Sequence, residues 1–551
     1  MTIVTRKHAI PGAWRGLLAG WLIGLGGCGG GSNSATGSMM PPPPPPQDAP
    51  PPGPAVDPQY RASAASPFAA GCDGTSAVGT AFANAEVEPS LAIDPINPQR
   101  LAAVWQQDRW STGGARAIMS AASADGGQTW TQIAMKFTRC GGGSAGNGGD
   151  YERASNPWIT AAPDGTLHQL ALAFDGAVLQ SGSVSAVLAA RSTDGGTTWG
   201  PTQTLVRDVD AFFNDKGAIT ADPITPGFVY AVWDRLTADN TGPTVFARST
   251  DGGTSWEPAR AIYDPGVNKQ TISNAIVVLP NGILIDMYLE VDSGSNNSFA
   301  SFGALIRSMD NGATWSQPVR IADNFSVGTR DTKNGKPVRD SALIPEIAVG
   351  PGGGLYYVWQ DGRFSGGNHD GIALAYSGDG GLTWSAPLEI NGAPDVAAFS
   401  PSVHVRADGE IGVTYYDFRS DTSAAATLYT DYWLARSSDG VHWHETQVAD
   451  PFDLALAPLT TSPAPGGYFL GDYQALLSVG QVFMPMFVRT NNGNPGDPTD
   501  VYFAPALSAT TAAAFTAYSA PHHQPTDELR RRVSDNIVRA MQARMSGWRE
   551  R

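Results

Sequence analysis

One short pattern recurs along the chain and constrains its fold more than any other feature. It reads Ser, any residue, Asp, any residue, Gly, any residue, Thr or Ser, Trp, and five copies follow it in full. The sixth copy, at 437–443, is one residue shorter, with Val441 and His442 where the hydroxyl residue should stand. The aspartates of the six copies are Asp125, Asp194, Asp251, Asp310, Asp379 and Asp439.

The residue types of this pattern favour a hairpin turn. An Asp side chain accepts backbone N–H bonds inside a tight turn, and glycine supplies positions with positive φ. The Thr or Ser hydroxyl can close back on the carboxylate, while the Trp enters the next strand and packs. Short alternating or apolar runs lie before and after each copy, as at 244–248 and 317–321. Each copy is therefore predicted to join two antiparallel strands.

The spacing of 57 to 69 residues between successive aspartates fits one four-stranded blade of a β-propeller. Seven pairs of inner strands can be read, so we predict an all-β propeller of seven four-stranded antiparallel blades, with six as the alternative. The last unit has no turn of this kind. Its fourth strand is expected from the N-terminal segment near 77–86, which would close the ring and remove an open edge.

The repeated turn matches the Asp box, or bacterial neuraminidase repeat, and residues 71–520 resemble the sialidase-type propellers. The resemblance implies that the boxes are structural and lie away from any ligand. It also implies a site on the opposite rim, where the first inner strands begin and the second inner strands end.

Sialidases hold a carboxylated sugar with arginines and use a Tyr nucleophile with a nearby Glu and an Asp acid/base. By resemblance, Tyr473 is the candidate nucleophile, Glu346 the proton acceptor and Asp108 the acid/base. Substrate-binding candidates are Arg109, Arg363 and Arg419.

Two departures from the family weaken this match. Val87-Glu88-Pro89 stands where the family has Arg-Ile-Pro, and the loop after Arg109 lacks a carboxylate, which is why Asp108 serves as a substitute.

Structural roles compete with these assignments. Asp-Arg or Asp-x-Arg endings recur in four repeats, which also fits ion pairs of the scaffold, and Tyr473, Glu346 and Glu88 also fit packing roles at strand starts. Two functions remain open. One is an exo-acting glycoside hydrolase releasing sialic acid or a related acidic sugar. The other is a non-catalytic propeller that binds glycans or proteins through its rim.

Net charge limits the partners. The 51 acidic and 35 basic residues give a formal charge of −16, which argues against nucleic-acid binding. The eight histidines show no metal-ligand spacing, so neither a metal nor a cofactor is predicted.

The N-terminus reads as an export signal over 1–27, with a short apolar run at 17–25. Residues 25–28 resemble a bacterial lipobox, which makes Cys28 the lipidated residue; an ordinary signal peptide is the alternative. Residues 28–70 form a Pro-, Gly- and Ser-rich linker. Gly29 fits an outer-membrane destination. We therefore expect a lipid-anchored protein of the bacterial cell envelope.

Two further segments carry predictions. Export would place Cys72 and Cys140 in an oxidising compartment, which predicts a disulfide between them. In the C-terminal segment 521–551, an apolar stripe at i, i+4 spacing and five arginines between 526 and 548 predict a basic amphipathic helix. Packing on the acidic propeller is its simpler role, and binding a membrane surface or a partner is the alternative.

Overall fold

The computed structural model describes residues 58–74, 79–237, 241–294, 298–423, 426–461, 466–491, 494–506, 514–519 and 525–546. The chain divides into two compact units, Met1–Ala49 and Pro50–Arg551, and every described residue belongs to the second. The predicted signal peptide, the lipidation site Cys28 and the linker up to residue 57 lie outside the described residues.

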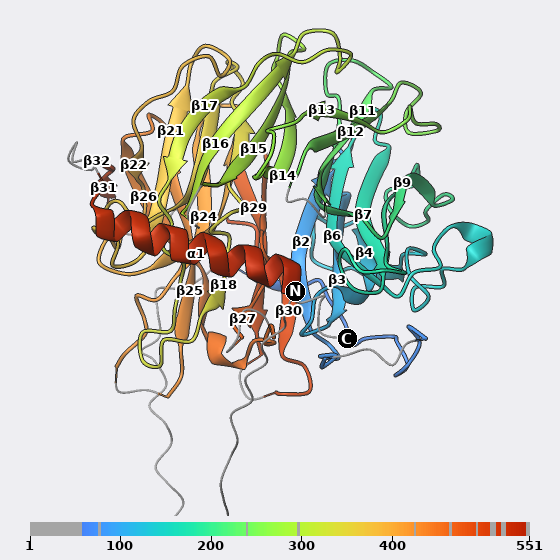
Figure 1. The fold of residues 1–551 in the computed structure, drawn as a ribbon, viewed down its shortest axis with the longest axis horizontal. Helices are drawn as coiled ribbons and strands as arrows, with labels where there is room; N and C mark the ends of the chain where they lie inside the picture. The colour runs from blue at the N-terminus through green and yellow to red at the C-terminus, as the bar shows by residue number, and fades with distance from the viewer. Residues whose placement is uncertain are drawn as a thin grey trace, which may run out of the picture. The chain divides into compact units, whose positions relative to one another are not determined.

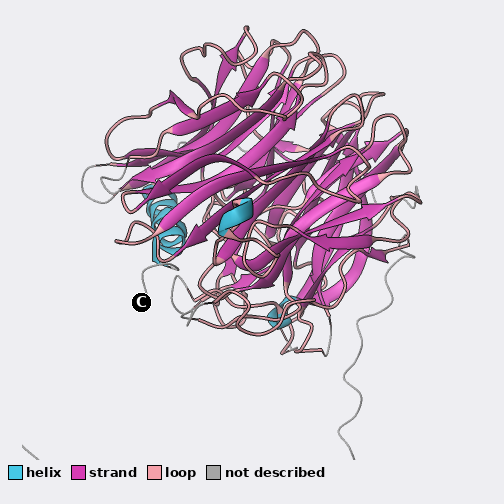
Figure 2. Ribbon diagram, turned by 90° about the vertical axis from the view of Figure 1, so that its right-hand side faces the viewer, coloured by secondary structure: helices cyan, strands magenta, loops and turns pink. Residues whose placement is uncertain are grey.

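Antiparallel sheets built from consecutive strands make up the second unit (Figures 1 and 2). The first sheet has eight strands: β2 (Glu86–Ile93), β3 (Leu101–Arg109), β4 (Ala115–Ser123), β6 (Arg153–Ala161), β7 (Leu167–Asp175), β8 (Val184–Ser192) and β9 (Gln203–Val209), with β5 (Thr131–Ala134) paired to β4. Two four-stranded sheets follow: β10 (Phe212–Ala221), β11 (Val229–Thr237), β12 (Thr244–Ser249) and β13 (Arg260–Tyr263), then β14 (Lys269–Val278), β15 (Leu284–Ser293), β16 (Phe299–Ser308) and β17 (Val319–Asn324).

The later sheets also recruit strands from the two chain ends. The first contains β19 (Glu346–Val349), β20 (Leu355–Asp361), β21 (Gly371–Ser377), β22 (Leu388–Glu389) and β32 (Tyr518–Ser519), and the second contains β23 (Ala398–Val405), β24 (Ile411–Asp417), β25 (Tyr429–Ser437), β26 (His442–Asp453) and β31 (Ala514–Thr516). The last contains β28 (Ala475–Val479), β29 (Val482–Thr490), β30 (Thr499–Phe503) and β1 (Tyr60–Arg61). Three short elements and a parallel pair complete the part before the C-terminal helix: η1 (Ala145–Asn147), η2 (Leu454–Leu456), and β18 (Val338–Arg339) with β27 (Tyr468–Phe469).

The fold is an all-β propeller. In Figure 1 the sheets follow one another in chain order, and the blue strand β2 comes to lie near the orange strands β29 and β30. Five sheets have four or five strands, and one has eight because a single residue pair, Ala115 with Ala154, joins β4 to β6. The sheet boundaries therefore do not confirm the predicted count of seven blades, or the alternative of six.

The Asp-box turns have the predicted geometry. In the first box, Ser123 Oγ donates to Asp125 Oδ1 at 2.8 Å, and Thr129 Oγ1 donates to Asp125 Oδ2 at 2.6 Å. In the shortened sixth box, His442 Nδ1 lies 2.7 Å from Asp439 Oδ2 and replaces the missing hydroxyl. An imidazole nitrogen thus takes the place of the Thr or Ser hydroxyl that contacts the aspartate in the other boxes.

The second glycine of the box also explains how neighbouring sheets pack. Gly127 has φ +89°, and a Cβ at this position would lie 2.2 Å from the ring of Phe503 in the last sheet. Gly312 has the same relation to Phe246, which belongs to the preceding sheet. Glycine is needed at these two corners both for the turn and for close approach to the neighbouring sheet.

An N-terminal strand closes the ring, but it is not the one predicted. Tyr60 pairs with Phe503 and Arg61 with Tyr502, so β1 is the outer strand of the last sheet. The described part of the predicted segment, 79–86, instead leads into β2 in the first sheet, and it pairs with the last sheet only in an isolated parallel bridge between Ala85 and Thr499. The propeller therefore begins by residue 60, and not at the predicted boundary of residue 71. A strand of two residues in a polar, Pro-rich segment has no pattern by which the sequence could indicate it.

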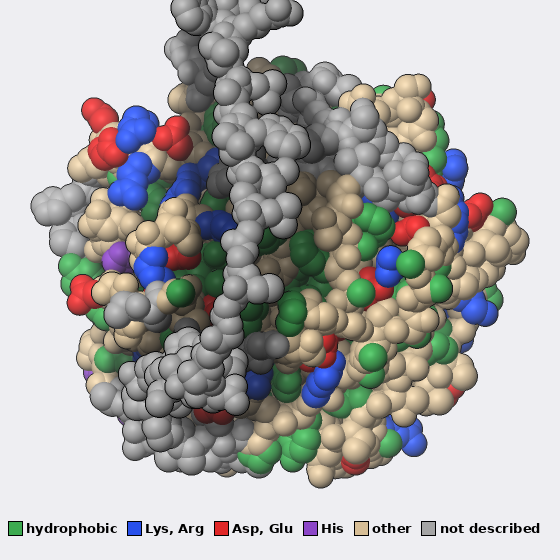
Figure 3. Space-filling model, turned by 90° about the horizontal axis from the view of Figure 1, so that it is seen from below, with side chains coloured by type: hydrophobic (Ala, Val, Ile, Leu, Met, Phe, Trp, Pro, Cys, Tyr) green, Lys and Arg blue, Asp and Glu red, His purple; other side chains and the backbone are tan. Residues whose placement is uncertain are grey.

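The surface is chemically mixed on the face shown in Figure 3, where the Lys and Arg side chains are interspersed with Asp and Glu. Larger concentrations of charge lie inside the fold, among residues that are nearly inaccessible to solvent.

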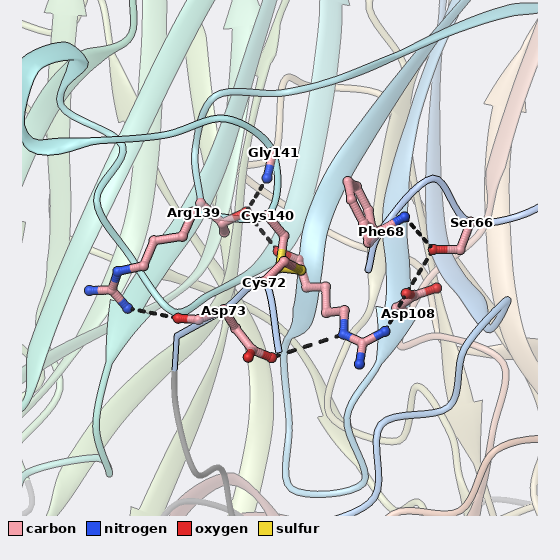
Figure 4. Close-up of a disulfide and its surroundings, with 10 residues drawn as sticks. Ser66, Phe68, Cys72, Asp73, Asp108, Arg139, Cys140 and Gly141 are labelled. Carbon is pink, nitrogen blue, oxygen red and sulfur yellow. Dashed lines mark hydrogen bonds and ion pairs between the residues drawn. A yellow bond between two sulfur atoms is a disulfide. The ribbon is translucent and has the colours of Figure 1, made fainter. Parts of the chain in front are cut away.

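Cys72 and Cys140, the predicted pair, are disulfide-bonded, with Cα atoms 4.9 Å apart and a sequence separation of 68 (Figure 4). Next to the bond, Arg139 donates to the Asp73 carbonyl at 3.2 Å. The chain-entropy model assigns a loop of this length roughly 4 kcal/mol of stabilisation. The disulfide therefore ties the segment before β2 to the loop after β5.

The helix α1 (Asp527–Ser546) follows the propeller and packs against it. Its stripe of Leu529, Val533, Ile537 and Met541 is buried against Leu289 and other apolar residues of the neighbouring sheet. This contact agrees with the packing role predicted for the apolar stripe. In the part of the chain that the structure describes, no helix is both long and apolar enough to cross a membrane.

Candidate functional site

The inner strands of the propeller share a strained position at their start. Five of them carry a register shift at which a residue other than glycine has φ between 44° and 62°. These residues are Glu88, Asn156, Lys216, Ser273 and Ser400. A left-handed backbone is costly for residues with a side chain, and such strain often accompanies functional sites. The bulges reorient polar groups at the same place in successive inner strands.

Two of these residues belong to a buried charge network, which we call the mouth cluster: Glu88, Lys216, Arg339 and Asp472. The Lys216 ammonium contacts the Asp472 carboxylate and lies 3.9 Å from Glu88. Arg339 binds the same carboxylate with two donors, Nε to Oδ1 at 3.0 Å and Nη2 to Oδ2 at 2.7 Å. Four different sheets or connecting segments thus bring charges of both signs together.

The surroundings shift the pKa values of the two carboxyl groups of the mouth cluster in opposite directions. Burial favours the neutral form of both, but Arg339 and Lys216 outweigh it at Asp472 and hold its pKa well below the usual range. At Glu88 burial dominates, and the pKa of its carboxyl is raised. One carboxyl is therefore strongly anionic while its neighbour holds a proton more readily, a combination typical of functional acid and base pairs.

Arg109 extends the mouth cluster. Its Nη1 donates to Gln106 Oε1 at 2.8 Å, and the amide of Gln106 in turn donates to Glu88. Arg109 and Arg339 lie over the same ring, Phe469, at 4.7 and 4.8 Å from its centroid. Burial, with help from Arg339, lowers the pKa of Arg109 to about 10.

A cavity of about 90 Å³, the mouth cavity, opens beside the cluster. Its charged lining consists of Lys216, Arg330, Arg339, Arg539, Asp340 and Asp472. Because one water needs about 10–15 Å³ of space measured in this way, the cavity holds several waters or a group such as a carboxylate. Four cations and two carboxylates line the cavity; Lys216 and Arg339 already bind Asp472, so Arg330 and Arg539 supply the excess positive charge that favours an anionic group.

Tyr473 and Glu346 lie in the central channel. Both line its cavity of about 580 Å³ and a smaller one of about 70 Å³, to which Lys216 also contributes. The Tyr473 hydroxyl donates to the Pro157 carbonyl at 2.8 Å, and its ring packs 5.2 Å from that of Trp158. The structure thus brings the predicted nucleophile and proton acceptor into one cavity, without an Asp-box residue among the described lining residues.

Glu346 is poorly compensated. One oxygen accepts from the Val403 N–H at 3.3 Å, while Oε1 is enclosed without a hydrogen-bond partner among the described residues. Burial therefore raises the pKa of Glu346 to about 8. A carboxylate with this pKa is a far stronger base than an ordinary one.

The other predicted site residues form hydrogen bonds and ion pairs away from these cavities. Asp108 is buried and accepts from Arg116 at 3.0 Å and from Ser66 at 2.8 Å, away from both cavities. Arg363 binds Asp361 through two hydrogen bonds of 2.8 Å. Its position fits the scaffold ion pair that the repeated Asp-x-Arg endings suggested.

Arg419 has the same structural character. It binds Asp417 at the end of β24 and reaches Glu445 at 2.8 Å, and its guanidinium lies 3.8 Å over the Trp433 ring. The structure therefore places Arg109, and not Arg363 or Arg419, beside the mouth cluster.

Sequence reasoning missed most cations of the mouth. Lys216 occupies the same bulge position as Glu88, one residue before Gly217 or Pro89, and an alignment of the inner strands indicates it. Arg339 and Arg330 come from the connection between β17 and β19, and Arg539 from α1, where no repeat marks them. Only the tertiary fold brings these three arginines to the same cavity.

No protein-family model matches the chain. Its structure is similar to a Penicillium chrysogenum α-L-arabinanase solved with arabinobiose, at 16% identity and a TM-score of 0.41 over 66% of this chain and 94% of that one. An α-L-arabinofuranosidase from Fusarium graminearum gives 12% and 0.40, over 76% and 93%. A Trypanosoma rangeli sialidase gives 15% and 0.35, over 64% and 54%. At these scores, the description of the fold rests on the sheet topology itself.

Proposed function

We propose that this protein is a glycoside hydrolase-like propeller that recognises an acidic sugar at the mouth of its channel. The observation that carries the proposal is the mouth cavity, where Lys216, Arg330, Arg339 and Arg539 face a space the size of a carboxylate in a chain with a net charge of −16. Guanidinium groups bind carboxylates with two parallel hydrogen bonds, so this lining selects acidic over neutral sugars.

The binding proposal is tested by calorimetry on the full-length protein with N-acetylneuraminic acid, glucuronic acid and the neutral sugar arabinose. We expect the two acids to bind and arabinose to bind at least tenfold more weakly, which is about 1.4 kcal/mol. Arg339→Gln should weaken acid binding, while Arg320→Gln, which alters an exposed arginine paired with Asp323, should not. Equal binding of all three sugars would contradict the proposal.

Hydrolysis is the second candidate function, and the pairing of Tyr473 with Glu346 in one cavity favours it. In this reading Tyr473 attacks the anomeric carbon, Glu346 accepts the phenol proton, and Glu88 replaces Asp108 as the group that protonates the leaving oxygen. The Tyr473 hydroxyl must first leave the Pro157 carbonyl. Turnover of a fluorogenic sialoside that disappears in Tyr473→Phe would support this step. An inert wild-type protein that still binds acidic sugar leaves the non-catalytic glycan or protein binder.

The blade count is also part of this proposal. We infer seven blades, because β2–β5 and β6–β9 each form a four-stranded meander and are joined only through Ala115 and Ala154. A crystal structure in which these eight strands pack as one continuous blade would contradict it.

We further propose that the protein is exported and lipidated at Cys28, with the propeller held at the outer membrane of a two-membrane bacterium. Metabolic labelling with a fatty-acid analogue should mark the wild type and not Cys28→Ser. Labelling of both forms would overturn lipidation at this cysteine.

A further inference from the structure

Three carboxylates meet where the two ends of the ring join, and one of them, Glu86, lies in the same strand as Glu88 of the mouth cluster. Glu86 opens β2, Asp500 lies in β30, and Asp497 precedes that strand. One oxygen from each residue lies within 4.8 Å of the others. The first strand of the first sheet and the last sheet thus share an acidic cluster, which we call the seam cluster.

Glu86 is the unbalanced member of the seam cluster. Its side chain is fully buried; one oxygen accepts from the Gln107 amide, while Oε2 has no hydrogen-bond partner among the described residues. A buried carboxylate oxygen without a donor is costly, and either a proton or a cation must compensate it.

The cationic groups near the seam cluster do not neutralise it. Among the described residues, its ion pairs involve Arg61, which contacts Asp500 and lies 3.1 Å from Asp497. Arg61 belongs to the closing strand β1, and its side chain is 38% exposed. Three carboxylates and one guanidinium leave two negative charges in excess when all are ionised.

The spacing of the oxygens fits a large hard cation. Calcium binds oxygen at 2.3–2.6 Å, so oxygens that share one ion lie up to about 5 Å apart, whereas magnesium at 2.0–2.1 Å requires a tighter octahedron. The Gly496 and Asp497 carbonyls belong to the same loop and accept side-chain amides of Asn84 and Asn491. Both carbonyl oxygens already accept these amides, so the three carboxylates are the ligands that the cluster offers.

We propose that Glu86, Asp497 and Asp500 form a calcium site that fastens the first inner strand to the last sheet. Calcium supplies the missing partner of Glu86 and balances the two excess charges. Arg61 competes with the ion for Asp497 and Asp500, and its partly exposed side chain has a path to solvent when the ion binds. The site is structural and independent of the sugar proposed for the mouth.

The test is calcium binding to the full-length protein after treatment with EDTA, measured by calorimetry and by thermal unfolding with and without CaCl₂. We expect one calcium ion per chain and a higher unfolding temperature with calcium, because a ligand that binds the native state stabilises it. Glu86→Gln should weaken binding by at least about tenfold, because the charge of the ligand set controls calcium affinity. Asp497→Asn, at a less buried position, should do the same.

Two further variants distinguish calcium binding at the seam cluster from non-specific binding to an acidic protein. Asp408→Asn, which changes an exposed carboxylate paired with Arg406, should bind calcium as the wild type does. Arg61→Ala should bind at least as tightly, because the competing cation is gone. The proposal is overturned if neither the wild type nor Arg61→Ala binds calcium at millimolar concentration. It is also overturned if Glu86→Gln and Asp497→Asn, both folded by circular dichroism, keep wild-type affinity.

Discussion

The Asp-box corners and the mouth cluster use the same residue, aspartate, under opposite conditions. At the corners the carboxylate is exposed and receives short local hydrogen bonds, which lower the pKa of Asp251 to about 2 through Ser255 and its backbone. At the mouth, Asp472 is buried and depends on Lys216 and Arg339, from distant parts of the chain, for its charge. The first arrangement is local and repeated, and the second is assembled once.

The two arrangements suit different roles: the local turn stabilises the fold, and the assembled charge cluster can recognise a ligand. A turn whose hydrogen-bond donors and acceptors pair with one another can recur in every repeat, because it needs no partner from a neighbouring repeat. The mouth cluster has desolvated charges that only its partners compensate, so loss of one partner exposes the full cost of burial. A residue's place in a repeat therefore indicates scaffold, and its dependence on distant charges indicates a site.

The largest expected effect comes from breaking the mouth cluster. Asp472→Asn leaves the buried Lys216 and the partly exposed Arg339 without their shared carboxylate, and removal of one partner of a buried ion pair typically costs about 3–5 kcal/mol. Urea unfolding measures this loss. Glu257→Gln breaks the surface pair with Arg248 and should cost less than about 1 kcal/mol. Equal losses in the two variants would remove the distinction between buried and exposed pairs.

The pH dependence of stability should have opposite signs at Glu346, in the central channel, and at the Asp-box corners. The pKa of Glu346 is about 8 in the folded protein against 4.5 for a free side chain. The native state therefore binds the extra proton between these values, and stability falls as pH rises from about 4.5 to 8, by at most about 1.4 kcal/mol per pH unit. Glu346→Gln should flatten this slope, and an unchanged slope would contradict the assignment.

The corners should respond at the other end of the pH range. The pKa of Asp251 is about 2 when folded against 3.8 when free. Its stabilisation is complete above about pH 4 and is lost as pH falls toward 2. Urea unfolding of wild type and Asp251→Asn at pH 2.5 and 5 measures this difference, with a smaller effect of the substitution expected at pH 2.5.

A smaller loss is expected when one corner is opened. Ser192 Oγ donates to Asp194 at 2.7 Å and accepts from the Gly196 N–H at 3.0 Å. Ser192→Ala leaves that buried N–H unpaired and should cost about 1–3 kcal/mol by urea unfolding. Thr197→Ala, in the same turn but with an exposed hydroxyl, should stay within about 0.5 kcal/mol.

The smallest stability change is expected at Tyr473. Phenylalanine removes one hydrogen bond to the Pro157 carbonyl, worth about 1 kcal/mol. Tyr230→Phe, which loses a bond to Asp222 of the same 2.8 Å length, is the matched control for stability. A glycosidase activity that is lost in Tyr473→Phe but kept in Tyr230→Phe would show that Tyr473 acts in catalysis and not only in packing.

The sequence predicts the repeated parts of the molecule well because their cause is local. Each box contains its own donors, acceptors and glycines, so the turn and the propeller follow from residues a few positions apart. The mouth was only partly predicted, since Arg330, Arg339 and Arg539 come from a connection and a helix without repeats. The closing strand was misplaced because two residues, Tyr60 and Arg61, carry no periodic pattern.

That closing strand also sets the order in which the protein can be completed. Tyr60 leaves the ribosome early, whereas its partner Phe503 is made near the end of synthesis. The circle must therefore stay open during most of translation, with an unpaired edge on each side of the gap. A contact that holds the two sides of this gap together, such as the seam cluster, would therefore stabilise the closed ring.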